Sequence, residues 1–251
     1  MKLDFHVHGI LTKKSKFDEE MFIQGIEYAK EQGLNGIIMC EHFNAMNIFD
    51  IYNYLEENYP YEGDRYNVNG FYIFLGMEVD IKEGGHIIVS GNRKDILEIR
   101  NYLEDYTKKP DFIPFEDLLD IGEKHGCLMV GSHPYRDEHN ISKHPHRLLS
   151  RLDALDLNAT DLFKKGISIT VNEVDLLSKE LGIPYVTGSD SHFPIQLGSV
   201  GTRFGKDILN IKDLKYEIKS KKYDVEISNS LQLKVFAAKK AKESIKRVLN
   251  T

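Results

Sequence analysis

The sequence predicts an α/β fold in which short strands alternate with longer helices around a mainly parallel sheet. Runs of β-type residues recur along the whole chain, and the segments between them carry apolar residues at helical spacing. The expected strands are 2–7, 36–40, 71–79, 86–90, 127–131, 154–157, 185–188 and 225–228. The expected helices are 18–32, 49–58, 96–106, 115–124 and 171–181. No linker rich in Pro, Gly or Ser and no internal repeat interrupts this pattern, so we expect one domain covering 1–251.

The first expected helix illustrates the signals used for the others. Ser15 or Asp18 can cap its start, and Gly33 lies just beyond its end. Its apolar stripe consists of Phe22, Ile26 and Ala29. A stripe of this spacing predicts a helix that packs one face against the sheet.

Two segments depart from the simple alternation. The stretch 59–69 is polar and rich in turn-forming residues, and we expect an insertion before the third strand. The stretch 231–249 is a Lys-rich amphipathic helix. Its candidate buried positions are Leu233, Phe236, Ala237, Ile245 and Val248. We expect a docked terminal helix with a solvated basic face, and the alternative is a site for a phosphate-rich partner.

Composition limits the class of protein. The chain has 33 Lys and Arg against 39 Asp and Glu, a net charge of -6, so a nucleic-acid partner is not expected. Its apolar runs are far shorter than a membrane span, and the polar residues near Met1 leave no room for a signal peptide. Cys40 and Cys127 lie in separate apolar runs, as buried thiols do in a reducing compartment. We therefore expect a cytoplasmic protein.

The first expected strand presents a row of metal-binding side chains. Residues 3, 5 and 7 are apolar and residues 4, 6 and 8 are polar, and strand alternation places the two sets on opposite faces. The apolar set is Leu3, Phe5 and Val7, and the polar set is Asp4, His6 and His8. If the apolar face packs under helices, the polar face points into a barrel. Burial of so many polar groups requires a metal ion or hydrogen bonds.

Similar side chains recur at the ends of the other expected strands, where active sites of parallel barrels are assembled. They are Glu41, His42, Glu78, Asp80, His86, His133, Asp190 and His192. Imidazole and carboxylate without cysteine favour zinc, manganese or iron over a structural zinc site. The set exceeds what one ion needs, so it predicts at least two divalent ions and the hydrolysis of phosphoesters.

These residues occur in motifs that resemble those of the polymerase and histidinol phosphatase (PHP) family. The motifs are Asp4-Phe5-His6-Val7-His8, Glu41-His42, Gly76-Met77-Glu78, Gly85-His86, Ser132-His133-Pro134-Tyr135-Arg136, Asp156-Leu157-Asn158 and Gly188-Ser189-Asp190-Ser191-His192. They follow one another in the family's order within residues 4–201. The resemblance implies a distorted TIM-like (β/α)7 barrel, a cluster of two or three metal ions and phosphoesterase activity.

The resemblance also assigns ligands. It implies that His6, His8, Glu78 and Asp190 hold one ion, that Glu78, His86 and His133 hold a second, and that His42 and His192 face a third. The sequence departs from the pattern at Lys13, where the family supplies a ligand to the third ion. Either that site is weak or absent, or Glu41 or Asp18 substitutes, or Lys13 itself faces the phosphate.

Two positive side chains are candidates for contact with a substrate phosphate. Arg136 is the first, as a charge-assisted clamp, and Lys13 the second; Lys14 and Arg203 follow. An ordinary salt bridge in a loop is the alternative for Arg136. The residues expected to orient the ligand imidazoles are Asp4, Glu41, Asp156 and Asn158. The histidines expected at the surface are His125, His139, His144 and His146, and the loop 135–146 is a candidate lid.

We therefore predict a metal-dependent phosphoesterase that hydrolyses a small-molecule phosphomonoester. Alternative substrates are a phosphotyrosine peptide, a nucleotide and an oligonucleotide diester. A different class of protein remains open, namely a binding or regulatory module that keeps the barrel but has lost catalysis. The sequence leaves the metal, the substrate and the oligomeric state undetermined.

Overall fold

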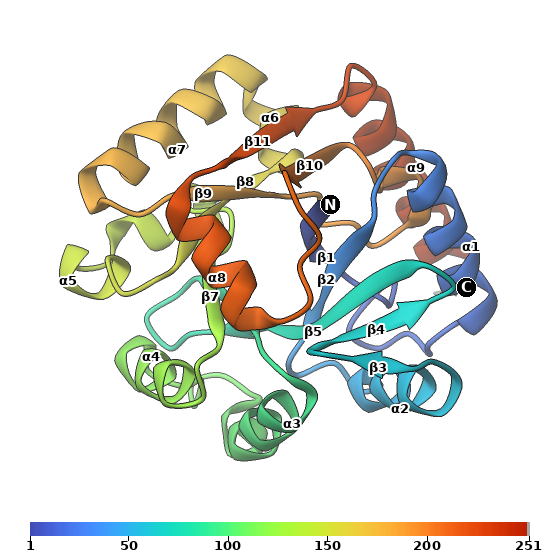
Figure 1. The fold of residues 1–251 in the computed structure, drawn as a ribbon, viewed down its shortest axis with the longest axis horizontal. Coiled ribbons are helices and arrows are strands. Elements are labelled where there is room, and N and C mark those ends of the chain that lie inside the picture. Colours follow the sequence, from blue (N-terminus) through green and yellow to red (C-terminus); the bar gives the residue numbers. More distant parts are fainter. Residues whose placement is uncertain (250–251) are drawn as a thin grey trace.

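The computed structural model describes residues 1–249, which form a nearly closed barrel-shaped sheet surrounded by helices (Figure 1). The strands are β1 (Lys2–Val7), β2 (Gly36–His42), β3 (Tyr61–Glu62), β4 (Arg65–Val68), β5 (Phe71–Asp80), β6 (His86–Ser90), β7 (Leu128–Gly131), β8 (Ala154–Asn158), β9 (Tyr185–Gly188), β10 (Val200–Phe204) and β11 (Tyr223–Ile227). The α-helices are α1 (Glu19–Glu31), α2 (Ile48–Asn58), α3 (Arg93–Tyr102), α4 (Phe115–Lys124), α5 (His146–Leu149), α6 (Ala159–Lys165), α7 (Ile167–Leu181), α8 (Ile211–Ser220) and α9 (Leu231–Leu249). Four short 3-10 turns are η1 (Leu103–Tyr106), η2 (Asp137–His139), η3 (Ile141–Lys143) and η4 (Pro194–Gln196). The distorted TIM-like barrel expected from the resemblance is confirmed.

The barrel closes where β1 meets the chain that follows β9. The sheet runs in the order β11-β10-β1-β2-β5-β6-β7-β8-β9. The amide of His8 donates to the carbonyl of Ser191 at 2.8 Å, and the amide of Asp190 donates to the carbonyl of His6 at 2.7 Å. These bonds place the metal-binding motifs at the two ends of the chain side by side.

Two apolar layers hold the barrel. The outer layer lies between the strands and the surrounding helices, and it includes Ile37 of β2 and Ile26 of α1. The inner layer joins alternate strand residues to α8, which lies across one end of the barrel (Figure 1). Its members include Leu3, Phe5, Ile38, Phe74, Ile88, Val130, Ile211, Leu214 and Ile218. The helix α8 therefore fills the end of the barrel opposite the ligand side chains.

A β-bulge in β1 corrects the predicted alternation. Asp4 pairs with Ile37 and Val7 with Met39, so three steps along β1 match two along β2. The extra residue changes which side chains face inward. Phe5 belongs to the inner layer and Val7 to the outer one, so the apolar residues of β1 do not share a face as predicted. Because of the bulge, Phe5 packs in the barrel while His6 also reaches the ligand cluster.

The strand β6 runs antiparallel to β5, against the expectation of a mainly parallel sheet in this region. In the register of the pair, Asp80 at the end of β5 lies opposite His86 at the start of β6. This direction explains why His86 lies at the start of β6, whereas the other metal-binding residues lie toward or just after the ends of their strands. All the motifs therefore meet at one end of the barrel.

Other differences from the prediction lie in short elements. The segment 59–69 contains the hairpin of β3 and β4, which extends the sheet from β5. The prediction missed β10, α6 and α8. The sequence does contain a signal for α8, because Asn210 is a residue type that often caps helices. In the structure its Oδ1 accepts from the amide of Asp213 at 2.8 Å.

The helix α9 has the predicted range but a different buried face. Leu231, Val235 and Ala238 are buried, whereas Leu233, Phe236 and Val248 are exposed, so the predicted apolar face was wrong. The reason is Lys234, which is buried and hydrogen-bonded rather than solvated. Among residues 1–249, no helix is long and apolar enough to cross a membrane.

Candidate metal centre

Glu78 lies at the centre of the ligand cluster. It projects from β5, is 2% exposed, and five imidazole nitrogens lie within 3.7 Å of its carboxylate oxygens. The distances are 2.9 Å to His86 Nδ1, 3.0 Å to His42 Nδ1, 3.2 Å to His133 Nε2, 3.4 Å to His6 Nε2 and 3.7 Å to His8 Nε2. These side chains come from β1, β2, β6 and the loop after β7, so the barrel itself assembles them around one carboxylate.

The first group combines His6, His8 and Asp190 with Glu78. His6 Nε2 lies 3.2 Å from His8 Nε2, and Asp190 Oδ1 lies 3.7 Å from the former and 3.4 Å from the latter. Two ligands of one tetrahedral ion with bonds of about 2.1 Å lie roughly 3.4 Å apart. The spacing of His6, His8 and Asp190 therefore fits a divalent ion held between them, and Glu78 Oε1 lies 3.4 Å from His6 Nε2 beside this group.

The second group consists of Glu78, His86 and His133, all of them buried. His133 Nδ1 is a buried atom without a hydrogen-bond partner among the described residues. The backbone of His133 has a φ of +30°, a conformation that costs energy in residues with a side chain. In this conformation His133 Nε2 lies 3.2 Å from Glu78 Oε1.

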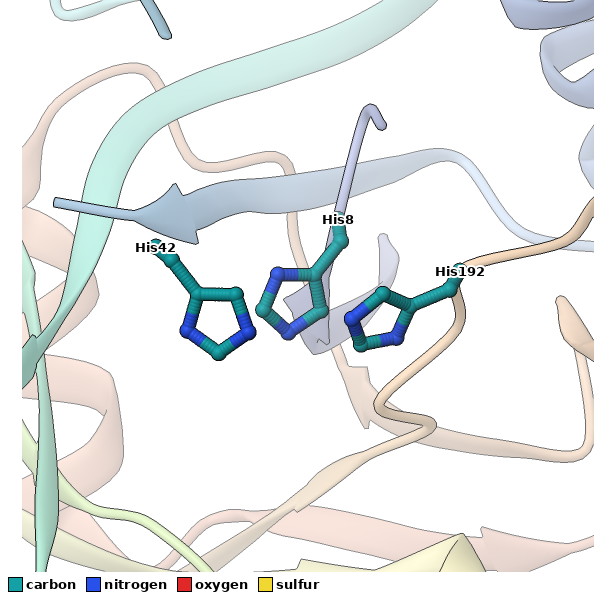
Figure 2. Close-up of side chains that lie close together, drawn as sticks. All are labelled: His8, His42 and His192. Carbon is teal, nitrogen blue, oxygen red and sulfur yellow. The ribbon is translucent and has the colours of Figure 1, made fainter. Parts of the chain in front are cut away.

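The third group is formed by His8, His42 and His192, whose rings lie next to one another (Figure 2). The ring centroids of His8 and His192 are 3.9 Å apart, and those of His8 and His42 are 4.6 Å apart. His8 thus stands beside the two histidines that the resemblance assigned to a third ion. The two carboxylates proposed as substitute ligands for the third ion have other partners. Asp18 Oδ1 caps α1 by accepting from the amide of Met21. Glu41 accepts backbone amides at both oxygens, from Ile10 at Oε2 and from His42 at Oε1.

Two carboxylates orient the imidazoles of β1. Asp156 Oδ2 lies 2.9 Å from His6 Nδ1, and Glu41 Oε1 lies 3.4 Å from His8 Nδ1. Asn158 Nδ2 donates to the same Asp156 oxygen at 2.8 Å. In each imidazole the other nitrogen, Nε2, faces Glu78 and Asp190. Carboxylates in this position fix the tautomer that leaves Nε2 free to bind a metal.

Asp4 acts on the backbone of the site. Its Oδ1 accepts from the amides of Ser189 at 2.8 Å and His6 at 3.2 Å. Complete burial raises the pKa of Asp4 to about 7, against the effect of these hydrogen bonds. Asp4 thus ties the bulge of β1 to the chain that carries Asp190, and it contacts no imidazole side chain directly.

Arg136 holds Asp190 in place. Its guanidinium donates from Nη1 to Asp190 Oδ2 at 2.7 Å, from Nη2 to Asn158 Oδ1 at 2.8 Å and from Nε to Asp161 Oδ1 at 3.1 Å. Three of its five N–H groups are therefore used inside the protein. Burial opposes the charge of Asp190, but Arg136 and then His6 lower the pKa of this carboxyl group well below its usual range.

The electrostatics keep the central carboxylate ionised and several imidazoles neutral. Burial alone would raise the pKa of Glu78, but His86, His6 and His42 lower it well below its usual range. Burial, reinforced by Arg136, lowers the pKa of His133 to about 3. Burial and the nearby His8 lower the pKa of His192 as well. Neutral imidazoles and ionised carboxylates are the forms that bind a metal ion.

The structure gives contacts in the site to Asp80, which the sequence placed at a strand end without a role, and to His139, which it placed at the surface. Asp80 Oδ1 lies 3.0 Å from His86 Nε2, and its other oxygen accepts from Lys13 Nζ at 3.0 Å. His139, expected at the surface, lies against His86 with ring centroids 3.9 Å apart. The position of Asp80 at a strand end was a usable signal, whereas His139 reaches the site through a loop whose course the sequence does not specify.

The chain is similar to known proteins in one segment of its sequence and in its fold. Residues 172–223 match a family model described as PHP-associated, and this segment contains Asp190 and His192. No curated protein sequence matches the chain. The fold resembles that of PsfC from Pseudomonas syringae, with a TM-score of 0.80 and 21% identity, covering 97% of this chain and 98% of that one.

Two further structures share the fold. The lesion-specific endonuclease PfuEndoQ from Pyrococcus furiosus aligns with a TM-score of 0.64 and 20% identity, over 90% of this chain but 58% of its own. A candidate metal-dependent phosphoesterase from Bifidobacterium adolescentis aligns with a TM-score of 0.51 and 13% identity, over 88% of this chain and 96% of its own. The family-model match and the shared barrel confirm the resemblance to the PHP family.

Proposed function

We propose that this protein is a metal-dependent phosphoesterase whose substrate is a small phosphomonoester. The observation that carries the proposal is the convergence of five imidazoles on Glu78, two of which also lie within 3.7 Å of Asp190, at distances that suit shared metal ions. The barrel fold is shared with a lesion-specific endonuclease and with a candidate metal-dependent phosphoesterase, which supports phosphoester chemistry for the same rim.

The proposed cofactors are two or three divalent ions, zinc, manganese or iron. His6, His8, Asp190 and Glu78 would hold one, Glu78, His86 and His133 a second, and His8, His42 and His192 offer a third position. Such ions, when bound, polarise a phosphoryl group and make a bound water more acidic. Glu78 and Asp190 supply ionised carboxylates, whereas His6, His8 and His86, whose pKa values are raised, against burial, by the nearby carboxylates, would release a proton when a metal binds. Asp156 and Glu41 keep the imidazoles of His6 and His8 in the required orientation.

Arg136 and Lys13 are the proposed positive contacts with phosphate. Arg136 retains unused N–H groups next to Asp190 while its other bonds fix its position. Lys13 lies at the opposite side of the cluster, with a side chain 39% exposed and bound to Asp80. Both ammonium and guanidinium groups attract a phosphoester without taking part in bond formation.

The substrate class is tested by comparing the hydrolysis of different phosphoesters directly. A DNA-acting enzyme is among the proteins with this barrel, and the structure of Endonuclease Q includes a complex with a 27-mer duplex substrate. Phosphomonoesters, a phosphotyrosine peptide and an oligonucleotide should therefore be assayed side by side with manganese and zinc. We expect turnover of small monoesters; hydrolysis of oligonucleotides alone would overturn this ranking.

The metal centre is tested by Glu78→Gln, which keeps the shape of the side chain and removes its charge. We expect the bound metal to fall by at least half and phosphatase activity to fall at least 100-fold, because both groups of ligands share this carboxylate. The matched control is Glu57→Gln on the exposed side of α2, which should change neither quantity. Unchanged metal content in Glu78→Gln would refute the site, and full metal content in a wild-type protein without turnover would favour a binding module.

A further inference from the structure

The metal-ligand cluster opens into a basic cavity of about 1030 Å³. Its walls are the loop 11–16 and the helix α9, and His42 and His192 lie in its lining. Among the residues that the structure describes, five lysines also line it, whereas Asp18 is the one carboxylate in the lining. The lysines are Lys13, Lys14, Lys16, Lys242 and Lys246. We name this space the lysine cavity.

Four of these five lysines form no ion pair within the described residues, although Asp190 and Glu41 act on the charge of Lys242 from farther away. Lys13 is paired with Asp80 at 3.0 Å, and the Asp18 carboxylate caps α1. Within residues 1–249, no carboxylate oxygen forms an ion pair with any of the other four. Their positive charges therefore face the cavity and the solvent, which is favourable when an anion enters.

The helix α9 is fixed in a way that directs Lys242 toward the site. Lys234 Nζ donates to the carbonyl of Leu197 at 2.8 Å, to Gln32 Oε1 at 2.9 Å and to Tyr28 Oη at 3.1 Å. Val235 and Ala238 are buried on the same face. Lys242 follows these residues by seven and four positions, so it lies on this inward face. Lys242 is half-buried and lines the lysine cavity together with His42 and His192. The helix α9 lies beside α1 (Figure 1).

The size and charge of the lysine cavity indicate what it binds. One phosphate ester held at the metal centre would occupy a small part of a space at the upper end of the usual range for small-molecule sites, about 300–1,000 Å³. Lys242 lies close enough to Asp190 to feel its charge, and the other unpaired lysines line the loop 11–16 and the last turns of α9. They would contact a substrate only if it carried negative charge beyond the group at the metal centre.

We propose that the lysine cavity is a subsite for a second phosphate, so that the substrate is a small molecule with at least two phosphate groups. One phosphate lies at the metal centre, and the other lies between Lys242 and Lys246 on one side and Lys14 and Lys16 on the other. The assignment of a bisphosphate substrate rests on the proposed phosphoesterase function. The affinity of the cavity for a second phosphate does not.

Binding tests the subsite without turnover. Calorimetric titration of the chelator-treated full chain should show at least tenfold tighter binding of pyrophosphate than of orthophosphate. In the double variant Lys242→Gln and Lys246→Gln this preference should fall below threefold. The matched control is Lys239→Gln on the exposed face of α9, which should keep it. Equal affinity for the two anions in the wild type, or the same loss in the control, would overturn the proposal.

Kinetics separate the two proposals. With manganese, the wild type should hydrolyse fructose 1,6-bisphosphate with a kcat/KM at least tenfold above that for fructose 6-phosphate, and the double variant should lose this preference mainly through KM. A pyrophosphate preference without turnover of any ester would refute the phosphoesterase and leave the subsite standing. Turnover of monoesters without either preference would refute the subsite alone. A preference for oligonucleotides over both sugars would refute a small-molecule substrate.

Discussion

At the scale of single residues, the site depends on close packing around a glycine. Gly188 ends β9, and its Cα lies against the side chains of His6 and Asp156. A Cβ at this position would overlap Cβ of His6 and lie 2.6 Å from Asp156 Oδ1. The absence of a side chain at 188 therefore allows the hydrogen bond that orients His6.

The variant Gly188→Ala should damage the metal centre more than its size suggests. The added methyl group must push His6 away from Asp156, so we expect a loss of about 1–3 kcal/mol in the free energy of unfolding and a several-fold loss of metal affinity. Urea unfolding and metal titration measure the two effects. Gly205→Ala is the control, because a Cβ at 205 meets no atom within 4 Å. Equal effects of the two variants would contradict the prediction.

The imidazole of His86 predicts a dependence on pH. Burial opposes its protonation, but Glu78 and Asp80 raise its pKa from 6.5 to about 9. A raised pKa means that protonated His86 stabilises the metal-free fold below about pH 6.5, and that this contribution is lost as the pH rises through about 9. Metal binding competes with the same proton, so metal affinity should rise over that interval.

Measurements on the metal-free chain check the sign. The difference in unfolding free energy between wild type and His86→Gln should be largest near pH 6 and should shrink toward pH 9, by up to about 3 kcal/mol. His125→Gln serves as a control, since His125 pairs with Asp95 outside the metal-ligand cluster. A difference that grows with pH would show that His86 is neutral in the metal-free fold.

At the scale of elements, α9 is held by one buried charge. The ammonium of Lys234 donates to three oxygens from α1 and from the turn that follows η4. Hydrogen bonds from charged groups contribute about 1.5–3 kcal/mol each when a buried partner would otherwise remain unpaired. Since Lys242 and Lys246 follow on the same helix, the docking of α9 also determines the shape of the lysine cavity.

The variant Lys234→Met should loosen α9. We expect a loss of about 2–3 kcal/mol in unfolding free energy, because the carbonyl of Leu197 loses its donor in a buried place. Faster amide exchange across α9 should accompany it. Lys239→Met on the solvent side of α9 removes the same charge without these bonds and should change little. An unchanged exchange rate in α9 would show that its apolar contacts suffice.

The elements also show what the sequence can and cannot predict. Strands such as β1, β6 and β9 have the predicted bounds, because alternation and flanking turns are local signals. The bulge in β1 and the antiparallel direction of β6 depend on pairing with neighbours, so composition did not reveal them. The predicted buried face of α9 was wrong because Lys234 is buried, where the prediction assumed only apolar residues. Its ammonium donates to three oxygens.

The candidate site was more predictable than the fold around it. Its ligand types follow from chemistry, and the motif resemblance placed Glu78 between two groups of histidines, which is where it lies. The residues that the sequence missed, His139 and Lys242, reach the site from a loop and from the last helix. Such positions depend on tertiary packing, which no local pattern encodes.

At the scale of the whole molecule, the proposed ions join parts of the barrel that are distant in sequence. The ligand side chains come from β1, β2, β5, β6 and the segments after β7 and β9, and they meet at Glu78 and Asp190. Each ion would therefore bind the folded chain and not the unfolded one. Binding of this kind stabilises the fold by an amount that rises with the logarithm of the free metal concentration above Kd.

Removal of the ions should thus lower the melting temperature of the full chain. At a free metal concentration of 100 times Kd the stabilisation is about 2.7 kcal/mol. For a chain of this size, 1 kcal/mol corresponds to about 2–4 °C, so we expect chelation to lower Tm by about 5–10 °C and added manganese to restore it. Glu78→Gln should show a much smaller response and Glu57→Gln the full one. If chelation removed the metal from wild type without changing Tm, the ions would not bridge the strands, and the carboxylate–imidazole contacts alone would hold this end of the barrel together.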